Sequence, residues 1–254
     1  LATVMYGPLV LAGEMGAEKL TSEMFYAKGQ RDYDTGPSIE VPIFVVRDND
    51  PNLWIEPAPG RPLAFRTVGV GQPNDVTLVP YHTLFGQRYN VYWRIVREGS
   101  QQHRRLLAEQ AARQARRART VDAVEIGIDT SETEHELQGK NMAVGFHNGR
   151  NWRHASDGGW ILYTMRVLPD VPMILSCTYW GSDTGARTFD VLVDGAKIAT
   201  QKLDRDKPDE FFEVEYSITA ELTRGKEQVA VKFQAHDGHT AGGVFGCEVL
   251  KPLQ

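Results

Sequence analysis

The sequence predicts an all-β protein: two jelly-roll-like β-sandwich domains joined by a short α-helical linker. The first observation behind this prediction is a succession of short runs rich in Val, Ile, Phe and Tyr, separated by clusters of Gly, Pro, Asn and Asp, which is typical of strands and turns. The second is that one clear stretch of good helix formers without Gly or Pro occurs, at residues 100–119. The third is that 254 residues, 41% of them hydrophobic, suffice for one large or two ordinary domains with packed cores.

Residues 1–96 are predicted to form the first β-sandwich region. A polar, turn-rich segment at residues 14–38 interrupts its strand-like runs, and we expect it to be a long excursion from the sheet. The runs themselves are residues 3–13, 39–46, 63–70, 76–84 and 88–96.

The linker, residues 97–120, contains the predicted helix, with Ser100 as its N-cap. The arginines of this helix raise RNA or an acidic membrane as alternative partners. No aromatic residue interleaves these charges, however, and the helix is short. We therefore interpret it as a solvated helix between two β-domains, with its Leu and Ala side chains resting on one of them.

Residues 121–254 are predicted to form the second sandwich, a jelly roll. The Asp194-Gly195 pair lies between two alternating runs, which is a strong signal for a type I′ hairpin turn, and no helical pattern interrupts the region. The predicted strands are residues 121–127, 160–168, 173–180, 187–194, 197–203, 210–218, 227–235 and 244–250.

Charge and cysteine content argue against several classes of partner. Residues 120–254 carry 13 basic against 21 acidic side chains, so this half is a poor surface for nucleic acid, whose binding depends on neutralising phosphates. No apolar run is long enough to cross a bilayer. The two cysteines, Cys177 and Cys247, are too few for a multi-cysteine metal site and are interpreted as buried free thiols, with a disulfide left open.

No catalytic or metal-binding motif is found, and we expect neither kind of residue in this chain. The Gly-x-Ser-x-Gly nucleophile motif is absent, and the carboxylates fall mostly at strand-exterior or turn positions. His236 and His239 would need a third ligand to hold zinc. The acidic stretches 125–136 and 204–210 match no calcium-loop motif and are interpreted as solvated turns, with a structural calcium ion as the alternative.

The segment 147–160, HNGRNWRHASDGGW, is the strongest functional signal and is interpreted as a polar loop that leads into a strand. Flat aromatic rings can bind the C–H face of a sugar, while amide, carboxylate and guanidinium groups bind its hydroxyls. Trp160 and Asp157 are assigned instead to the corner where the strand begins. The candidate carbohydrate-binding residues are Trp152, Arg153, Asn148, Asn151 and Trp180.

Seven phrases, in order over nearly the whole chain, are more specific than a generic sandwich: MYGPLVLAGE, VTLVPYHTLFGQRYNVYW, HELQGKN, WRHASDGGWILY, CTYWGSD, FDVLVDGAKIATQKL and FQAHDGHTAGGVFG. Together they resemble the C-terminal part of the β-L-arabinofuranosidase-like bacterial glycoside hydrolases. The resemblance implies a catalytic (α/α)6 barrel, with a zinc site of cysteines and a glutamate, that is missing from this chain. It also implies a first sandwich that is incomplete on its N-terminal side. The second domain looks like a galactose-binding-like jelly roll, by analogy of fold alone.

The function implied by this resemblance is that of non-catalytic C-terminal domains of a glycoside hydrolase. They would support the barrel, their partner in the same protein, and bind an arabinose-containing or related plant glycan without a cofactor of their own. The expected location is periplasmic or extracellular in a bacterium, and nucleic acid and membrane are not expected partners. A purely structural or oligomerisation module without ligand is the first alternative, and an autonomous enzyme is the second.

Overall fold

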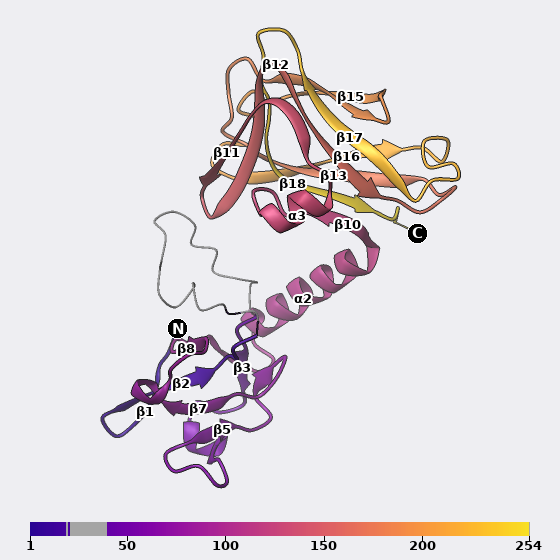
Figure 1. Ribbon diagram of the computed structural model, residues 1–254. Coiled ribbons are helices and arrows are strands. Elements are labelled where there is room, and N and C mark those ends of the chain that lie inside the picture. Colours follow the sequence, from indigo (N-terminus) through magenta and orange to yellow (C-terminus); the bar gives the residue numbers. More distant parts are fainter. Residues whose placement is uncertain (19, 21–39, 254) are drawn as a thin grey trace. The chain divides into compact units, whose positions relative to one another are not determined.

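The computed structural model describes residues 1–18, 20 and 40–253 and divides into two compact units, Leu1–Ala111 and Ala112–Gln254 (Figure 1). Both are built of strands, and helix α2, Gln101–Arg119, contains the boundary between them. The predicted class, two β-sandwich domains joined by a helical linker, is confirmed. The excursion expected at residues 14–38 lies largely outside the described residues. In the described ranges, no helix is both long and apolar enough to span a bilayer.

The first unit packs a six-stranded sheet against a three-stranded sheet around one apolar core. The centre of this core is Trp93, which is fully buried and stacks on Phe44 with 4.6 Å between ring centroids. Gly13 makes room for the indole, since a Cβ at this position would lie 2.5 Å from the Trp93 ring. The larger sheet contains β1 (Val4–Tyr6), β2 (Leu9–Glu14), β4 (Ile55–Pro57), β5 (Phe65–Thr67), β7 (Thr77–Pro80) and β8 (Tyr89–Asn90), and the smaller contains β3 (Ile43–Val46), β6 (Gly71–Gln72) and β9 (Ile95–Arg97).

Side chains near both ends of helix α2 make stabilising contacts, and the contact at its N-terminus was expected from the sequence. The Ser100 hydroxyl accepts a hydrogen bond from the His103 backbone N–H at 3.1 Å, which confirms the predicted N-cap. In its last turn, the Arg116 guanidinium donates to Glu213 and Glu248 at 2.7 and 2.9 Å. Arg116 therefore connects the last turn of α2 to β16 and β18, within the second unit, through a charge-assisted network.

The second unit is a nine-stranded, curled sheet with the path β15-β14-β17-β12-β18-β13-β16, to which β10 adds beside β18 and β11 beside β12 (Figure 1). One short helix, α3 (Asp129–Glu134), precedes β11. The strands are β10 (Thr120–Val124), β11 (Gln138–His147), β12 (Arg150–Arg166), β13 (Met173–Trp180), β14 (Thr188–Val193), β15 (Ala196–Lys202), β16 (Phe211–Ile218), β17 (Gln228–Ala235) and β18 (Ala241–Leu250).

Strict alternation of apolar residues builds the core of this unit. In β17 every second side chain, from Val229 to Ala235, points inward and is buried, as the period of two in a strand requires. The turn between β14 and β15 has φ of 49° at Asp194 and 81° at Gly195, as a type I′ hairpin requires. Cys177 and Cys247 are buried free thiols that lie opposite each other on β13 and β18.

The long strand β12 changes partners along its length, and this folds the sheet back on itself. Its first part pairs with β18 through Arg153 and Ala155, whereas its second part, from Trp160 to Arg166, pairs with β17. The change falls at Asp157 and Gly158, whose φ values of 58° and 68° bend the strand.

The interpretation of residues 147–160 as a loop is therefore wrong. The turn is confined to Asn148 and Gly149, and β11 and β12 form a long hairpin on either side of it. The Gly and Asp residues that signalled a loop form a bend within β12. A Cβ at Gly159 would lie 2.3 Å from the Lys140 carbonyl oxygen, so a glycine is needed where the two strands cross closely.

Candidate functional site

A cleft of about 490 Å³ lies on the outer face of the second unit, where the β11–β12 hairpin meets β13 and β18. It combines aromatic walls with a small number of polar groups, as ligand sites in proteins usually do. The residues that line it are Phe146, His147, Trp152, His154, Trp180, Ser182, Asp183, Arg187, Gly243 and Phe245.

The alternation of β12 decides which of its side chains reach the cleft. Trp152 and His154 line it, whereas Arg153 and Ala155 point to the opposite face of the strand. Ala155 is fully buried, so this opposite face is the one that covers the core. The cleft is consequently built on the solvent face of the sheet.

A glycine on the neighbouring strand leaves room for the Trp152 ring. Gly145 is its direct partner in the β11–β12 register, and a Cβ at Gly145 would lie 2.4 Å from the Trp152 ring. The indole therefore lies across the backbone of β11 in space that any larger residue would fill. Its ring centroid is 4.8 Å from that of His154, the next residue on the same face.

Trp180, at the end of β13, forms the second aromatic wall. Its ring centroid lies 4.9 Å from that of His147 and 4.8 Å from that of Phe211. Phe211 in turn packs edge-on against Phe245 of β18, with 4.9 Å between their centroids. These tilted and edge-on contacts hold the half-buried indole in one orientation while leaving part of it accessible.

Asp183 and Arg187, in the connection between β13 and β14, supply the polar side of the cleft. The Arg187 guanidinium donates to the Gly242 carbonyl at 2.6 Å, and its other terminal nitrogen lies 3.7 Å from Asp183 Oδ1. The second carboxylate oxygen of Asp183, Oδ2, is buried, and the Gly243 backbone amide is a hydrogen-bond donor to this carboxylate.

Burial is the largest influence on the pKa values of Asp183 and His154, two residues that line the cleft. Desolvation raises the pKa of Asp183 above its ordinary value, against the opposing influence of Arg187, the Gly243 amide and the His147 and His154 rings. Desolvation also lowers the pKa of His154, and the nearby Arg187 lowers it further. Burial thus disfavours the charged form of both side chains.

The structure brings two of the five candidate residues together and separates the other three from them. Trp152 and Trp180 line the same cleft. Asn148 lies in the hairpin turn with φ of 48°, and Asn151 packs beside Gly127. Arg153 is an inward-facing partner of Glu132. The expected platform of Trp152 with Arg153 and its neighbouring Asn residues is not formed, because consecutive residues of a strand face opposite ways.

Sequence reasoning missed most of the polar and histidine lining of the cleft. His147 and His154 belong to the segment that was singled out, and they would have been found by treating it as a strand and choosing the face of Trp152. Asp183 and Arg187 follow Trp180 closely along the chain. Gly243 and Phe245 come from β18, and no local pattern connects them with the hairpin.

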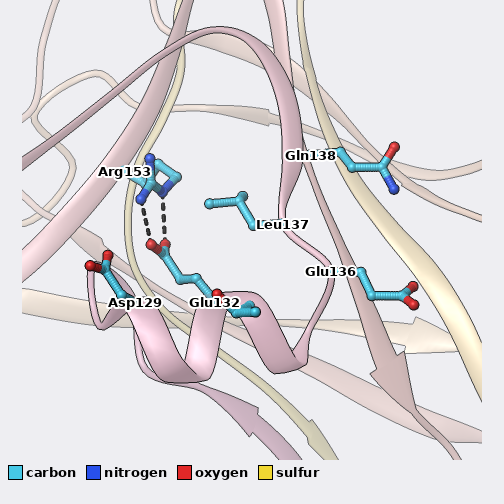
Figure 2. Close-up of a pocket in the computed structure, with 7 residues that line it drawn as sticks. Asp129, Glu132, Glu136, Leu137, Gln138 and Arg153 are labelled. Carbon is cyan, nitrogen blue, oxygen red and sulfur yellow. Dashed lines mark hydrogen bonds and ion pairs between the residues drawn. The ribbon is translucent and has the colours of Figure 1, made fainter.

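Arg153 belongs to a second hollow of about 760 Å³, beside α3 (Figure 2). Figure 2 shows its guanidinium facing the Glu132 carboxylate, to which it donates two hydrogen bonds, one of them 2.7 Å long from Nε to Oε1. The Tyr163 hydroxyl donates to the same carboxylate at 3.1 Å. Since the side chains of Glu132 and Arg153 are 4% and 12% exposed, this pair is a buried ion pair that attaches α3 to β12.

No metal centre is found in the described parts of the chain, where no three His, Cys, Asp or Glu side chains come together as ligands. His236 bonds to Asp190 at 3.1 Å, and its ring centroid is 6.2 Å from that of His239. Of the two acidic stretches, residues 125–136 contain α3 and the buried Glu132, which corrects their interpretation as a solvated turn.

The fold and the cleft define the class: a β-sandwich protein with an aromatic, ligand-sized cleft on one sheet face. Residues 115–250 match the family described as "Family of unknown function (DUF6805)", and this match spans more than half of the chain. The chain belongs to this family. Residues 1–95 match a second family, DUF4986, described as "Domain of unknown function". No curated protein matches the sequence.

Solved structures similar to the chain include carbohydrate-binding modules. A family 35 module from Clostridium thermocellum is 14% identical with a TM-score of 0.36, over 46% of this chain and 93% of that one. CBM35 from Paenibacillus barcinonensis is 11% identical with a TM-score of 0.38, over 51% and 97%. An exo-beta-1,3-galactanase from Phanerochaete chrysosporium is 10% identical with a TM-score of 0.38, over 50% and 28%. At these values the likeness carries no argument about the ligand of this chain.

Proposed function

We propose that this chain is a non-catalytic region that binds carbohydrate through the cleft between Trp152 and Trp180. The observation that carries the proposal is that these two tryptophans, singled out in the sequence for their polar surroundings, line one cleft together with Asp183 and Arg187. An aromatic ring provides a large contact area for the C–H face of a sugar at low entropic cost, and the polar groups orient its hydroxyls.

The size and the chemistry of the cleft agree with this role. Its volume of about 490 Å³ falls within the roughly 300 to 1,000 Å³ that is typical of small-molecule sites. Its lining contains a single carboxylate, that of Asp183. Glycoside hydrolysis usually requires two carboxyl groups that flank the scissile bond. The site is therefore suited to holding a sugar rather than to cleaving it.

The proposed context is a bacterial glycoside hydrolase that acts on arabinose-containing or related plant glycans outside the cytoplasm. The seven phrases that resemble the C-terminal part of β-L-arabinofuranosidase-like enzymes support this context. In it, the chain supports a catalytic barrel and holds the glycan near that barrel.

Affinity electrophoresis of the 254-residue chain in gels that contain arabinan and other plant polysaccharides tests the binding. We expect retardation of the unaltered chain and its loss in Trp152→Ala and Trp180→Ala. Trp160→Ala is the matched control, because Trp160 lies on the same strand but outside the cleft, with the Lys232 ammonium 4.8 Å from its ring centroid.

Two results would contradict the proposal in different ways. An absence of retardation in every gel would favour the structural or oligomerisation module without ligand. Hydrolysis of an aryl arabinoside by the chain alone would show an autonomous enzyme, against the non-catalytic role.

A further inference from the structure

We infer that the cleft binds two linked sugar residues, one at Trp152 and one at Trp180, and therefore recognises a stretch of a glycan chain rather than one terminal sugar. This inference rests on the proposed function and names the ligand class of the same site. It starts from the strand order, because β18 lies between β12, which carries Trp152, and β13, which carries Trp180.

The register across these three strands sets how far apart the two tryptophans stand. Val244 of β18 is the direct partner of Arg153 on one side and of Tyr179 on the other. Trp152 and Trp180 are the chain neighbours of these two partners. Since adjacent strands lie roughly 5 Å apart, the two indoles extend from backbones separated by roughly 10 Å. Bonds of about 1.5 Å limit a sugar ring with its hydroxyls to roughly 6 Å, so one ring spans only part of this distance.

Each indole lies against a strand on the side away from β18. The Trp152 ring lies across Gly145 of β11, which pairs with the edge of β12 opposite to β18. The Trp180 ring packs against Phe211, its direct partner on β16, which pairs with the other edge of β13. Both rings are half-buried, so part of each stays accessible. These contacts favour two separate aromatic surfaces over a narrow slot around a single sugar ring.

The floor between the two tryptophans is a glycine of β18. A Cβ at Gly243 would lie 3.2 Å from the Phe245 ring and 3.5 Å from the Trp152 Cβ, so it would point into the cleft that both residues line. A glycine within a strand often marks a place where a ligand approaches the backbone closely. Gly243 thus leaves the middle of the cleft open to a chain that passes from one tryptophan to the other.

The volume of the cleft also exceeds that of one sugar residue. A pentose residue has about ten carbon and oxygen atoms, and it would fill about 300 Å³ even if each atom took the roughly 30 Å³ of a water molecule in the liquid. The cleft measures about 490 Å³. A second residue of the chain therefore has room beside the first.

The test compares the affinities of the full chain for methyl arabinofuranoside and for arabinotriose, measured by isothermal titration. We expect the trisaccharide to bind about tenfold or more tightly, because contact with the second indole buries further apolar surface. If affinity gels identify another plant polysaccharide as the ligand, its own methyl glycoside and trisaccharide replace this pair.

Variants of the cleft assign the two contacts. In Trp152→Ala and in Trp180→Ala, the trisaccharide should bind no more tightly than the monosaccharide does. Gly243→Ala places a methyl group on the floor between the indoles and should weaken binding of the trisaccharide more than that of the monosaccharide. Trp160→Ala, outside the cleft, should keep the full preference for the trisaccharide. Thermal unfolding of each variant checks that it is folded.

The outcomes separate this inference from the function on which it rests. Equal affinities of the unaltered chain for the two sugars would overturn the inference in favour of one ring held between both tryptophans, and would leave the proposed function standing. An unchanged preference for the trisaccharide in folded Trp180→Ala would also overturn it. Binding of neither sugar, together with no retardation by any plant polysaccharide, would contradict the proposed function itself, and the inference with it.

Discussion

Two carboxylates of the second unit, Asp183 and Asp122, have pKa values shifted in opposite directions, because their surroundings differ. Burial raises the pKa of Asp183, and its single guanidinium neighbour does not reverse this effect. Burial would also raise the pKa of Asp122, but the Arg166 backbone amide, the Arg166 guanidinium and His135 lower it below its ordinary value. The neighbours of Asp122 therefore favour its charged form, whereas the burial of Asp183 disfavours its charged form.

This contrast predicts opposite effects of removing each charge on the free energy of unfolding. A raised folded pKa means that the contribution to stability is present below the unfolded pKa and is lost as pH rises through the folded pKa. Asp183→Asn should therefore be more stable than the unaltered chain at pH 7, with a gain that disappears toward acidic pH.

Asp122→Asn is the control with the opposite sign. Its lowered folded pKa contributes stability above the unfolded pKa, which is lost as pH falls through the folded pKa. This variant should lose about 1 to 3 kcal/mol at pH 7 and less at acidic pH, the range expected for losing charged hydrogen bonds. Denaturant unfolding of both variants across this pH range measures the effect. A loss of stability at pH 7 in Asp183→Asn would contradict this account of the cleft.

At the scale of elements, the ion pair between α3 and β12 is a structural connection. Glu132→Gln would leave the Arg153 guanidinium buried without its anionic partner, and breaking such a pair costs about 3 to 5 kcal/mol. We expect a clear fall in the free energy of unfolding of the second unit, with binding to arabinan retained under conditions where the variant is folded. Loss of binding in a fully folded Glu132→Gln protein would return Arg153 to the binding site.

A second prediction at the scale of elements concerns Gly145 of the β11–β12 hairpin and the position of the Trp152 ring. A methyl group at this position would occupy the space of the Trp152 ring, so Gly145→Ala should displace the indole and weaken carbohydrate binding. Val144→Ala, a change at the adjacent, half-exposed residue of β11, is the matched control and should leave binding unchanged. Isothermal titration of both variants with the same oligosaccharide compares the two, and equal affinities would contradict the proposed position of Trp152.

The elements also show where prediction from the sequence succeeds and fails. Strands with strict alternation, such as β14 and β17, were predicted within one or two residues, because their inward positions are all apolar. The strand β11 was missed because its exposed side chains mask any alternation. The glycines and aspartate of β12 resemble a loop in the sequence, because the close crossing that requires Gly159 is with β11, a strand that the sequence did not reveal.

At the scale of the whole molecule, the sequence predicts two β-domains and a helix, and the chain divides at residues 111 and 112, within that helix. The candidate site was predictable only in part. Trp152 and Trp180 were found because each aromatic residue stands in a polar stretch of sequence. These tryptophans lie beside Asp183 and Phe245 because β18 pairs with both β12 and β13. The register of such pairing between distant strands cannot be read from a local sequence pattern.

The central claim is that a sugar binds between Trp152 and Trp180, and the five tryptophans of the chain allow a direct test with internal controls. Trp54 and Trp93 are buried in the first unit, and Trp160 lies outside the cleft. Each indole N–H gives one signal in a ¹⁵N–¹H NMR spectrum, which Trp→Phe variants assign. Titration with a neutral arabino-oligosaccharide should shift the signals of Trp152 and Trp180 and leave the other three unchanged. Shifts confined to the other tryptophans, or no shift at saturating oligosaccharide, would contradict the account.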